Sequence, residues 1–204
     1  MKKPPVAGII LAAGRSRRMG RDKLLLDWQG KPILQHVIDA ACGSDLSPLL
    51  LVVNQENTVL IDHMDLGFCR LIRHRGEVYS DSLRAGLAAL DAHCAGAMFL
   101  LGDQPLVTTK TITQLITAFQ EEPDRWVAPL FQGQRGNPVI APAAWFDHIL
   151  ALTGDTGPRR SLLDPNARLN LVQVDDPGVV FDVDTPADFQ RLRKNHAEDI
   201  KKPS

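Results

Sequence analysis

Residues 6–23 read V-A-G-I-I-L-A-A-G-R-S-R-R-M-G-R-D-K, an apolar run that breaks into a loop of glycines and cations. Residues 9–11 form a short continuous apolar run with β-branched members, which is typical of a parallel strand covered on both faces. The loop begins at Gly14. This stretch therefore predicts a buried first strand that ends in a basic loop.

The loop from Gly14 to Lys23 carries an excess of positive charge, because four arginines and Lys23 stand against the single carboxylate of Asp22. Gly14 and Gly20 can adopt positive φ, so backbone N–H groups can turn inward as an anion-binding concavity. Arginine adds forked donors and lysine a compact charge, which suits a polyphosphate. A solvated basic patch is the alternative, but ligands of open α/β sheets bind beyond the carboxyl ends of the strands, where this loop lies.

Two better-known phosphate loops are excluded. A Walker loop needs G-x-x-x-x-G-K-[ST], whereas Gly20 is followed by Arg21-Asp22-Lys23-Leu24. The dinucleotide fingerprint G-x-G-x-x-G is also missing from this stretch. The loop is therefore neither a P-loop nor an ordinary NAD-binding loop.

Length, charge and cysteine content narrow the class of protein. The 204 residues predict one domain over residues 1–204, with a core of about residues 5–195 and a polar tail over 196–204. A net charge of −1 predicts no attraction of the whole molecule to nucleic acid or to a membrane, so the partner should be small and anionic. The N-terminal apolar run is too short for a signal peptide or a membrane span, which predicts a cytoplasmic protein. Cys42, Cys69 and Cys94 lack C-x-x-C spacing and predict reduced, buried thiols.

The order of the expected elements predicts the fold. Pro32 suits the first turn of a helix whose buried face carries Leu34, Val37, Ile38 and Ala41. A strand over 49–54, a helix over about 57–64 and a strand over 69–73 complete a β-α-β-α-β pattern, which favours a parallel, right-handed wound sheet. Further expected elements are a helix capped by Ser80 or Asp81, strands over 97–101 and 126–130, a helix over 112–119, a hairpin leading into Val139, a helix over 143–152, strands over 172–174 and 179–181, and a helix from Pro186 with Thr185 as its N-cap. The expected fold is a single-domain, Rossmann-like, three-layer α/β/α architecture with a mostly parallel central sheet.

Asp103 is the first candidate metal ligand. It follows the expected strand over 97–101, and a carboxylate at the carboxyl end of a central strand is well placed for the ligand crevice. Mg2+ prefers one or two carboxylates with water and phosphate oxygens, so Asp103 needs a partner from elsewhere in the sequence. Asp182 and Asp184 are expected on one side of an extended strand, and Thr185 already fills the capping role there. The alternative for Asp103 is a turn or a cap near Thr108.

Several segments resemble one enzyme family. Residues 11–14, Ser16, residues 18–20 and Lys23 match the signature L-A-A-G-x-S-x-R-M-G-x-x-K of the molybdopterin nucleotidyltransferases, in the molybdenum cofactor cytidylyltransferase branch. The family's G-D-Q-P, R-G-x-P and D-x-D-T-P motifs are matched by residues 102–105, 135–138 and 182–186. Residues 154–163 resemble its G-D-x-G-A-R-x-L-L motif, although Pro158 replaces the alanine. The resemblance implies the fold of the nucleotide-diphospho-sugar transferases.

The resemblance also implies roles for individual residues. It implies Arg18, Lys23 and Asp103 as catalytic residues, and Asp103 with Asp184 as ligands of Mg2+, with Mn2+ as an alternative. The implied nucleotide contacts are Leu11, Ala12, Ala13, Gly14, Arg15, Ser16, Arg18, Lys23, Ser80, Ser82, Gly102 and Asp103. The implied acceptor contacts are Gln104, Arg135, Gly136, Asn137, Pro138, Asp155 and Arg159. For the segments around Ser80, Gly136 and Asp155, helix capping, a plain hairpin and loop punctuation remain alternatives.

The implied reaction is transfer of CMP from CTP to the phosphate of molybdopterin or Mo-molybdopterin. An acceptor that is already an anion needs no general base, so charge neutralisation and alignment carry the rate. Ala13 stands where the guanylyl-transferring relatives have glycine, which favours a pyrimidine. A client molybdoenzyme of the xanthine dehydrogenase type is the expected protein partner. The alternatives are a nucleotidyltransferase acting on a sugar or alcohol phosphate, and a non-catalytic chaperone that delivers the cofactor.

Overall fold

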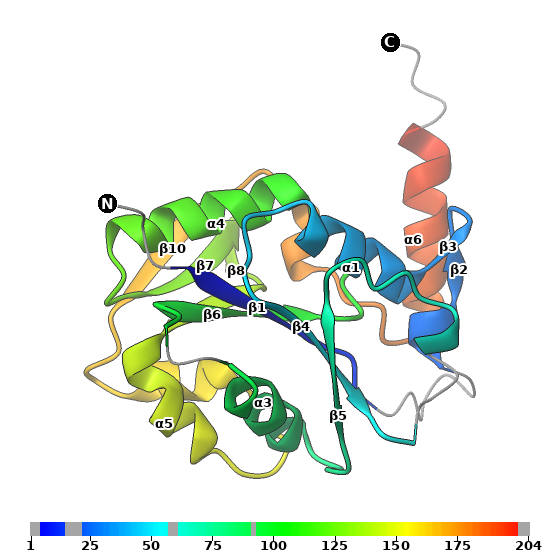
Figure 1. Ribbon diagram of the computed structural model, residues 1–204. Helices are drawn as coiled ribbons and strands as arrows, with labels where there is room; N and C mark the ends of the chain where they lie inside the picture. The colour runs from blue at the N-terminus through cyan, green and yellow to red at the C-terminus, as the bar shows by residue number, and fades with distance from the viewer. Residues whose placement is uncertain (1–4, 15–21, 57–60, 91–92, 200–204) are drawn as a thin grey trace.

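A computed structural model describes residues 5–14, 22–56, 61–90 and 93–199, with the backbone alone for residues 195–199. Its main feature is one sheet in the strand order β10-β7-β9-β6-β1-β4-β5, with β8 paired to β7 (Figure 1). Helices cover both faces of this sheet, so the expected three-layer α/β/α architecture is confirmed.

The half of the sheet that contains β1 is parallel. Strand β1 (Val6–Leu11) pairs in parallel with β4 (Leu49–Asn54) and with β6 (Gly96–Leu101), and β4 pairs with β5 (Arg70–His74). All residues of β1 and β4 are buried, as expected for central strands covered on both faces. The carboxyl ends of β1 and β6 therefore meet at one edge of the sheet.

The other half of the sheet is mixed. Strand β9 (Val139–Pro142) runs antiparallel to β6 and to β7 (Trp126–Phe131), while β10 (Leu169–Gln173) is parallel to β7. The expected hairpin is confirmed, because β8 (Gln134–Arg135) folds back on β7 through a two-residue turn.

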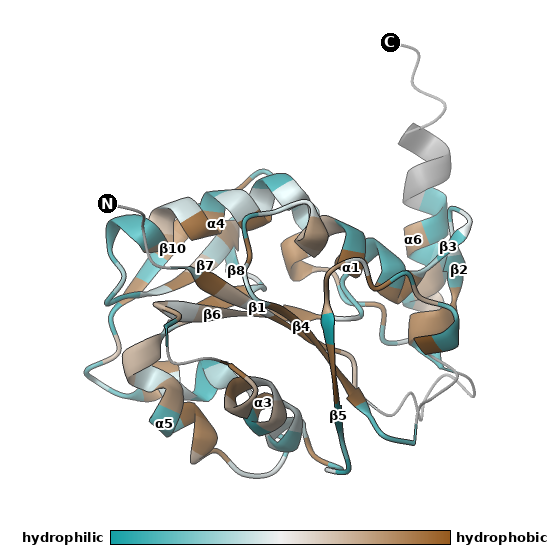
Figure 2. Ribbon diagram, in the orientation of Figure 1, coloured by the Kyte–Doolittle hydropathy of each residue, from teal (hydrophilic) through white to brown (hydrophobic). Residues whose placement is uncertain are grey.

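Two apolar clusters lie on opposite faces of the sheet. Helices α1 (Ile33–Cys42) and α4 (Thr109–Glu121) cover one face, and α3 (Tyr79–Ala88) and α5 (Phe146–Leu150) cover the other (Figure 1). Figure 2 shows the central strands as the most hydrophobic part of the ribbon. Burial of this apolar surface is the main term that favours the folded state.

A third apolar cluster lies where the C-terminal helix meets the short segment after the basic loop. It joins Leu26, Trp28 and Ile33 to Val183 and to α6 (Pro186–Asp199). Around it lie the 3-10 helix η1 (Lys23–Leu25) and the small ladder of β2 (Asp27–Trp28) with β3 (Lys31–Pro32). This cluster fixes the positions of Lys23 and of the segment before α6.

Several expected boundaries were wrong. Helix α1 begins at Ile33, and Pro32 is its N-cap rather than its first helical residue. The single helix expected over 143–152 is a 3-10 turn, η2 (Ala143–Trp145), followed by the short α5. The helix expected over 57–64 falls partly outside the described residues, and residues 61–62 are helical.

The strand expected over 179–181 is also wrong. Residues Pro177–Val180 form the 3-10 helix η4, because the Asp176 carboxylate accepts the Gly178 N–H at 2.9 Å and Pro177 occupies the first position. A second 3-10 helix, η3 (Pro158–Leu163), follows the loop that starts at Gly154.

The C-terminal segment is more regular than its polarity indicates. Helix α6 continues to Asp199, whereas a polar tail was expected over residues 196–204. The Thr185 N-cap is confirmed, because its hydroxyl accepts the Asp188 N–H at 3.2 Å and Asp188 accepts the Thr185 N–H at 2.9 Å. Within the described ranges, none of the helices has the length and apolar character to cross a membrane.

The cysteines are free thiols, as expected. Cys69 and Cys94 are buried as expected, but the expected burial of Cys42 is wrong, because this residue is partly exposed. The sulfur atoms of Cys42 and Cys69 lie 3.8 Å apart. Burial and the neighbouring Cys42 raise the pKa of the Cys69 thiol to about 12, so this thiol is protonated at neutral pH.

Candidate active site

Two distant aspartates meet at one lysine. The Lys23 Nζ atom lies 2.6 Å from Asp103 Oδ2 and 2.7 Å from Asp184 Oδ1. Asp103 stands just after β6, Lys23 begins η1, and Asp184 stands just before α6. The Lys23 side chain is 15% exposed, so this ion-paired group lies in a recess rather than on an open surface.

Backbone and side-chain hydrogen bonds bring the two carboxylate segments together. The Val183 N–H donates to the carbonyl oxygen of Asp103 at 3.0 Å. The side-chain amide of the buried Gln104 donates to Asp182. Asp182 and Asp184 therefore lie beside the end of β6, in a segment that is not a strand. The extended strand expected at this point is wrong.

The position of Lys23 is set by its own short helix. Asp22 accepts the Leu24 N–H at 3.1 Å and so caps η1. Leu24 is buried, and the Ile33 N–H donates to the carbonyl oxygen of Leu26 at 3.0 Å. With η1 fixed at both ends, the Lys23 side chain points to the carboxylates.

The charges of this cluster are strongly coupled. Burial alone would lower the pKa of Lys23, but the carboxylates of Asp103 and Asp184 outweigh it and raise the pKa above its ordinary value. Burial and the nearby charges of Asp103 and Asp184 raise the pKa of Asp182. Among the described residues, Lys23 therefore interacts with the carboxyl groups of Asp103, Asp182 and Asp184.

The donor set fits a hard divalent cation. Carboxylate oxygens are the ligands that Mg2+ and Mn2+ prefer, and Mg2+ takes few protein ligands because water and phosphate oxygens complete its octahedron. Asp103 and Asp184 already share one cation, the Lys23 ammonium group. Clusters of three or more His, Cys, Asp or Glu suited to a metal are not found in the part of the chain that the structure describes. These two carboxylates would thus be the protein's contribution to a metal that also binds phosphate.

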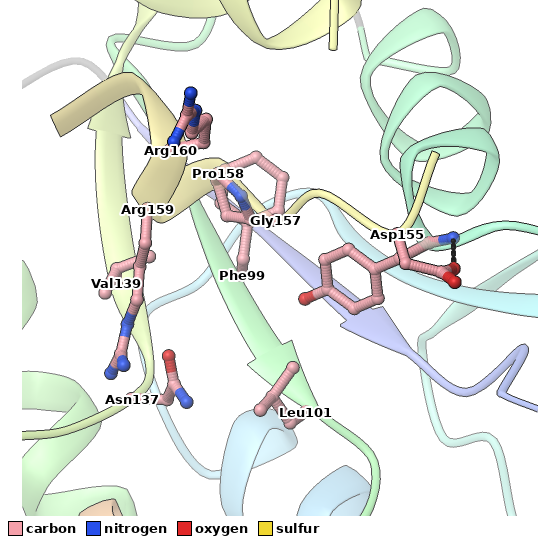
Figure 3. A pocket seen from close by; sticks show the side chains of 10 residues that line it. Phe99, Leu101, Asn137, Val139, Asp155, Gly157, Pro158, Arg159 and Arg160 are labelled. Carbon is pink, nitrogen blue, oxygen red and sulfur yellow. Dashed lines mark hydrogen bonds between the residues drawn. The ribbon is translucent and has the colours of Figure 1, made fainter. Parts of the chain in front are cut away.

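Two cavities lie near the carboxyl ends of β1 and β6, although Lys23, Asp103 and Asp184 are not among the lining residues that the structure describes. The first, of about 460 Å³, is lined by Ala13, Gly14, Gly76, Glu77, Val78, Tyr79, Ser82 and Asp155. The second, of about 340 Å³, is lined by Tyr79, Phe99, Leu101, Asn137, Val139, Asp155, Gly157, Pro158, Arg159 and Arg160 (Figure 3). Tyr79 and Asp155 line both, so the two cavities adjoin.

The first cavity has an oriented hydroxyl group. The Gly76 N–H donates to His74 Nδ1 at 3.0 Å, so the neutral ring carries its proton on Nε2. That proton faces the Ser82 hydroxyl oxygen at 3.1 Å. Ser82 therefore accepts from His74 and has its own hydroxyl proton available for a ligand. Burial lowers the pKa of His74, which keeps the ring neutral.

The second cavity combines an apolar floor with a basic rim. Phe99 and Leu101 come from β6 and Val139 from β9, and Figure 3 shows the Arg159 side chain extending past Val139 toward Asn137. Arg159 donates to the carbonyl oxygen of Gly136, so the loop after Gly154 is joined to the β8–β9 connection. Burial and the neighbouring Arg135 lower the pKa of Arg159.

Gly136 is required by close packing. A Cβ atom on Gly136 would lie 2.3 Å from the carbonyl oxygen of Val179, which is far inside van der Waals contact. The Asn137 N–H donates to that same carbonyl oxygen at 2.8 Å. The R-G-x-P segment is thus held directly against η4.

Tyr79 separates the two cavities. Its N–H donates to Asp155 Oδ1 at 3.2 Å, which ties the start of α3 to the loop after Gly154 (Figure 3). Burial, with the charges of Asp103 and Asp182, raises the pKa of Tyr79, and Arg159 opposes this shift. The phenol is therefore protonated and can donate a hydrogen bond.

The structure brings most of the sequence-predicted site residues to this region. Ala13, Gly14, Ser82 and Asp155 line the first cavity, and Asn137, Asp155 and Arg159 line the second. The Gly102 N–H donates to the carbonyl oxygen of Leu11 at 3.0 Å, and the Ala12 N–H donates to that of Val52 at 2.9 Å. Leu11, Ala12 and Gly102 therefore take part in the main-chain hydrogen bonds at the carboxyl ends of the central strands. Arg135 lies exposed on β8 and Pro138 just before β9.

Other predicted residues lie elsewhere. Ser80 is fully buried and is not among the described residues that line either cavity; its N–H donates to the carbonyl oxygen of Gly154. Arg15, Ser16 and Arg18 lie outside the described residues. The expected N-cap at Ser80 or Asp81 is wrong, because the N-cap of α3 is Val78, two residues before Ser80, and Asp81 instead accepts the Glu77 N–H at 3.0 Å. The Thr108 hydroxyl caps α4, so Asp103 does not.

Sequence reasoning did not select Tyr79, Arg160 or Asp182. Tyr79 is the only tyrosine in the chain and directly precedes Ser80-Asp81-Ser82, which was the available signal. Arg160 follows Arg159, so the basic pair at residues 159–160 was visible in the sequence. The apolar floor of Phe99, Leu101 and Val139 carried no such signal, since these residues read as ordinary strand core.

Comparison with known proteins gives full-length similarities. The chain is 28% identical over 208 residues to the purine catabolism protein PucB of Bacillus subtilis, covering 95% of this chain and 98% of that protein. It is 26% identical to the molybdenum cofactor cytidylyltransferase of Escherichia coli, over 93% of this chain and 96% of that one. The crystal structure of Rv0371c from Mycobacterium tuberculosis in complex with manganese superposes with a TM-score of 0.79 at 26% identity, covering 93% of this chain and 98% of that chain. A family model described as the MobA-like NTP transferase domain matches residues 8–171, and the chain belongs to this family of nucleotidyltransferases.

Proposed function

We propose that this protein transfers CMP from CTP to the phosphate of molybdopterin or Mo-molybdopterin and releases pyrophosphate. Family membership supports nucleotidyl transfer, and the name of the Escherichia coli relative supports the cytidylyl donor and the cofactor acceptor. The observation that carries the proposal is the shared contact of Asp103 and Asp184 with one cationic group, at the edge of the sheet where the two adjoining cavities also lie.

The two cavities suggest where donor and acceptor bind. The first cavity, beside Ala13 and Gly14 at the end of β1, would take the nucleoside, with the free hydroxyl proton of Ser82 as a donor to it. The Ala13 methyl group narrows this cavity and favours a pyrimidine over a purine. The second cavity, with the Arg159 guanidinium and an apolar floor, would take the acceptor.

The chemical step needs no general base from the protein. An oxygen atom of the acceptor phosphate attacks the α-phosphorus of CTP, and the bond between that phosphorus and the oxygen bridging to the β-phosphorus breaks. The electron pair leaves with pyrophosphate. Because the attacking phosphate is an anion at neutral pH, alignment and charge neutralisation supply the rate acceleration.

The residues of the cluster would supply that neutralisation. Asp103 and Asp184 would hold Mg2+ or Mn2+, which when bound offsets the negative charge of the phosphates. Lys23 would neutralise the departing pyrophosphate, and the Gly14 backbone would donate N–H groups to it. Arg15, Ser16 and Arg18 belong to this proposal as phosphate contacts through the signature alone.

The acceptor loop would be ordered by its own hydrogen bonds. Arg159 is held by the carbonyl oxygen of Gly136, and Asp155 is held by the Tyr79 N–H. Both segments, with Asn137 at the cavity wall, are thereby fixed before an acceptor binds. Fixed donors avoid the cost of reorganisation during the reaction. The proposed acceptor contacts also include Gln104, Arg135 and Pro138.

A client enzyme is part of the proposal. The Bacillus subtilis relative is named for purine catabolism, and xanthine is a purine, so we include a client molybdoenzyme of the xanthine dehydrogenase type. The partner would receive the cytosine dinucleotide form of the cofactor.

The test is a pyrophosphate-release assay with purified protein, CTP, Mg2+ and molybdopterin. We expect release of pyrophosphate and formation of the cytosine dinucleotide, with little product when GTP replaces CTP. Parallel reactions with a sugar phosphate or an alcohol phosphate address the other nucleotidyltransferase activities. Retention of nucleotide and cofactor without turnover would indicate a delivery chaperone and contradict the proposal.

A further inference from the structure

Lys23 occupies the place between the two carboxylates that a metal would bridge. Its ammonium group is within hydrogen-bonding distance of both Asp103 Oδ2 and Asp184 Oδ1, at 2.6 and 2.7 Å. A metal ion that contacts both of these oxygen atoms would come close to the position of the ammonium group. The ammonium group and the metal therefore compete for one pair of ligands.

The surroundings make the lysine a strong competitor. Its side chain is 15% exposed and that of Asp103 is 21% exposed, so solvent screens this pair less than an ordinary surface pair, whereas the Asp184 side chain is 50% exposed and its pair with Lys23 is screened more. Asp182 adds a third carboxyl group next to Asp103. Without Lys23, the carboxylates of Asp103 and Asp184 would lose the ammonium group that contacts both, and binding of another cation in its place would be favoured.

We infer that Lys23 is the resident counter-ion of this site, and that a divalent cation binds to Asp103 and Asp184 only by displacing the Lys23 ammonium group. The inference rests on the metal site of the proposed function. The displaced ammonium group keeps its charge and needs a new anionic partner, which the triphosphate of a nucleotide supplies. Metal and nucleotide therefore bind cooperatively, and the protein without nucleotide holds metal weakly.

Removing the charge of Lys23 gives the opposite result from removing an ordinary metal-site residue. Lys23→Met deletes the competitor and leaves both carboxylates in place, so Mn2+ should bind at least about tenfold more tightly than to the unmodified protein, since a like charge a few ångströms away is lost. Lys23→Arg keeps the positive charge and should bind Mn2+ as weakly as the unmodified protein. Were Lys23 only a phosphate ligand, neither substitution would change binding of the metal alone.

The experiment measures Mn2+ binding to the full-length protein without nucleotide, by titration calorimetry and by the electron paramagnetic resonance signal of free Mn2+. Lys31→Met is the matched control, because Lys31 forms a 2.6 Å pair with Asp39 on α1, with both side chains exposed. Asp103→Asn should weaken binding in either background. Circular dichroism checks that each variant folds, and Lys23→Gln replaces the methionine variant if that one does not.

Equal or weaker Mn2+ binding by the neutral Lys23 variants overturns the inference. Failure of every variant to bind Mn2+ overturns it as well, since the carboxylate pair would then not be a metal site. The readout is independent of catalysis. A protein that transfers no CMP but binds Mn2+ more tightly after Lys23→Met would contradict the proposed function and leave this inference standing.

Discussion

The backbone carbonyl oxygen of Asp103 accepts the N–H of Val183 at 3.0 Å, and this bond joins the end of β6 to the segment before α6. Val183 is fully buried in the cluster that also contains Ile33. Because Asp184 follows Val183 directly, its carboxylate is carried to the side of Asp103. Main-chain hydrogen bonding and apolar burial therefore fix the convergence of two like charges that would otherwise repel each other.

Loss of either charged partner at this site should reduce turnover and spare the fold. We expect Lys23→Ala and Asp103→Ala to lower kcat by at least about 10² to 10³, the usual cost of one preorganised charge-stabilising group. Steady-state pyrophosphate release in the presence of Mg2+ measures the effect. Lys31→Ala, which removes an exposed ion pair outside the site, should retain normal activity. Full activity in either site variant would reject the assignment.

Tyr79 should influence both substrates through its ring and the acceptor through its hydroxyl group. Tyr79→Ala joins the two cavities and should raise the KM for CTP and for the acceptor, since the ring lines both. Tyr79→Phe keeps the wall between the cavities and removes the donor near Asp103 and Arg159, so it should raise the KM for the acceptor alone. Equal effects of the two variants on both KM values would count against this division.

Gly136→Ala should destabilise the folded protein. The added methyl group would meet the carbonyl oxygen of Val179 at 2.3 Å, and a backbone atom cannot turn aside as a side chain can. We expect a loss of about 1–3 kcal/mol in the free energy of unfolding, the usual range for overpacking. Chemical denaturation measures it, and Gln134→Ala, on the exposed part of the same hairpin, is the matched control. An unchanged midpoint would show that the segment relaxes freely.

His74 should make stability depend on pH. Burial holds its pKa in the folded protein below the unfolded value of 6.5, so the unfolded chain binds the proton first as pH falls. The contribution of neutral His74 to the free energy of unfolding is therefore complete above pH 6.5. It is lost as pH falls from there toward the lower pKa of the folded state. Protonation would also remove the acceptor for the Gly76 N–H.

The free energy of unfolding, measured at pH 7.5 and pH 5.5, tests this dependence. It should fall with pH more steeply in the unmodified protein than in His74→Gln. His63→Gln, which changes an exposed histidine, should follow the unmodified protein. A slope that His74→Gln leaves unchanged would show that His74 does not contribute.

The sequence predicts the parallel half of the sheet well and the other half less well. Strand β4 matches its expected range because a continuous apolar run admits few alternatives, and β6 differs from its range by one residue. The expected hairpin implied that β9 runs antiparallel to β7, but the position of β9 between β7 and β6 was not readable, since an apolar run carries no information about which neighbours it pairs with. Residues 179–181 were read as a strand, although Pro177 and the Asp176 carboxylate favour the 3-10 turn that forms.

The candidate site was predictable only where polar residues followed strands. Asp103 stood out because a carboxylate after a buried strand has no packing role, and Asp184 was paired with it through the family motif. Lys23 was read as a phosphate ligand, and its contact with both carboxylates depends on the tertiary position of η1. Tyr79 was signalled only by its place before Ser80-Asp81-Ser82, because its position between two cavities arises from α3 and the Asp155 loop together.

The most direct test of the account is a crystal structure with Mn2+ and a non-hydrolysable CTP analogue, with anomalous scattering recorded at the manganese edge. We predict one anomalous peak within about 2.3 Å of carboxylate oxygens of both Asp103 and Asp184, with a phosphate oxygen of the analogue on the same ion and Lys23 moved onto the phosphates. A peak that contacts neither aspartate, or a structure in which Lys23 still bridges the two carboxylates while nucleotide and metal are bound, would contradict the account.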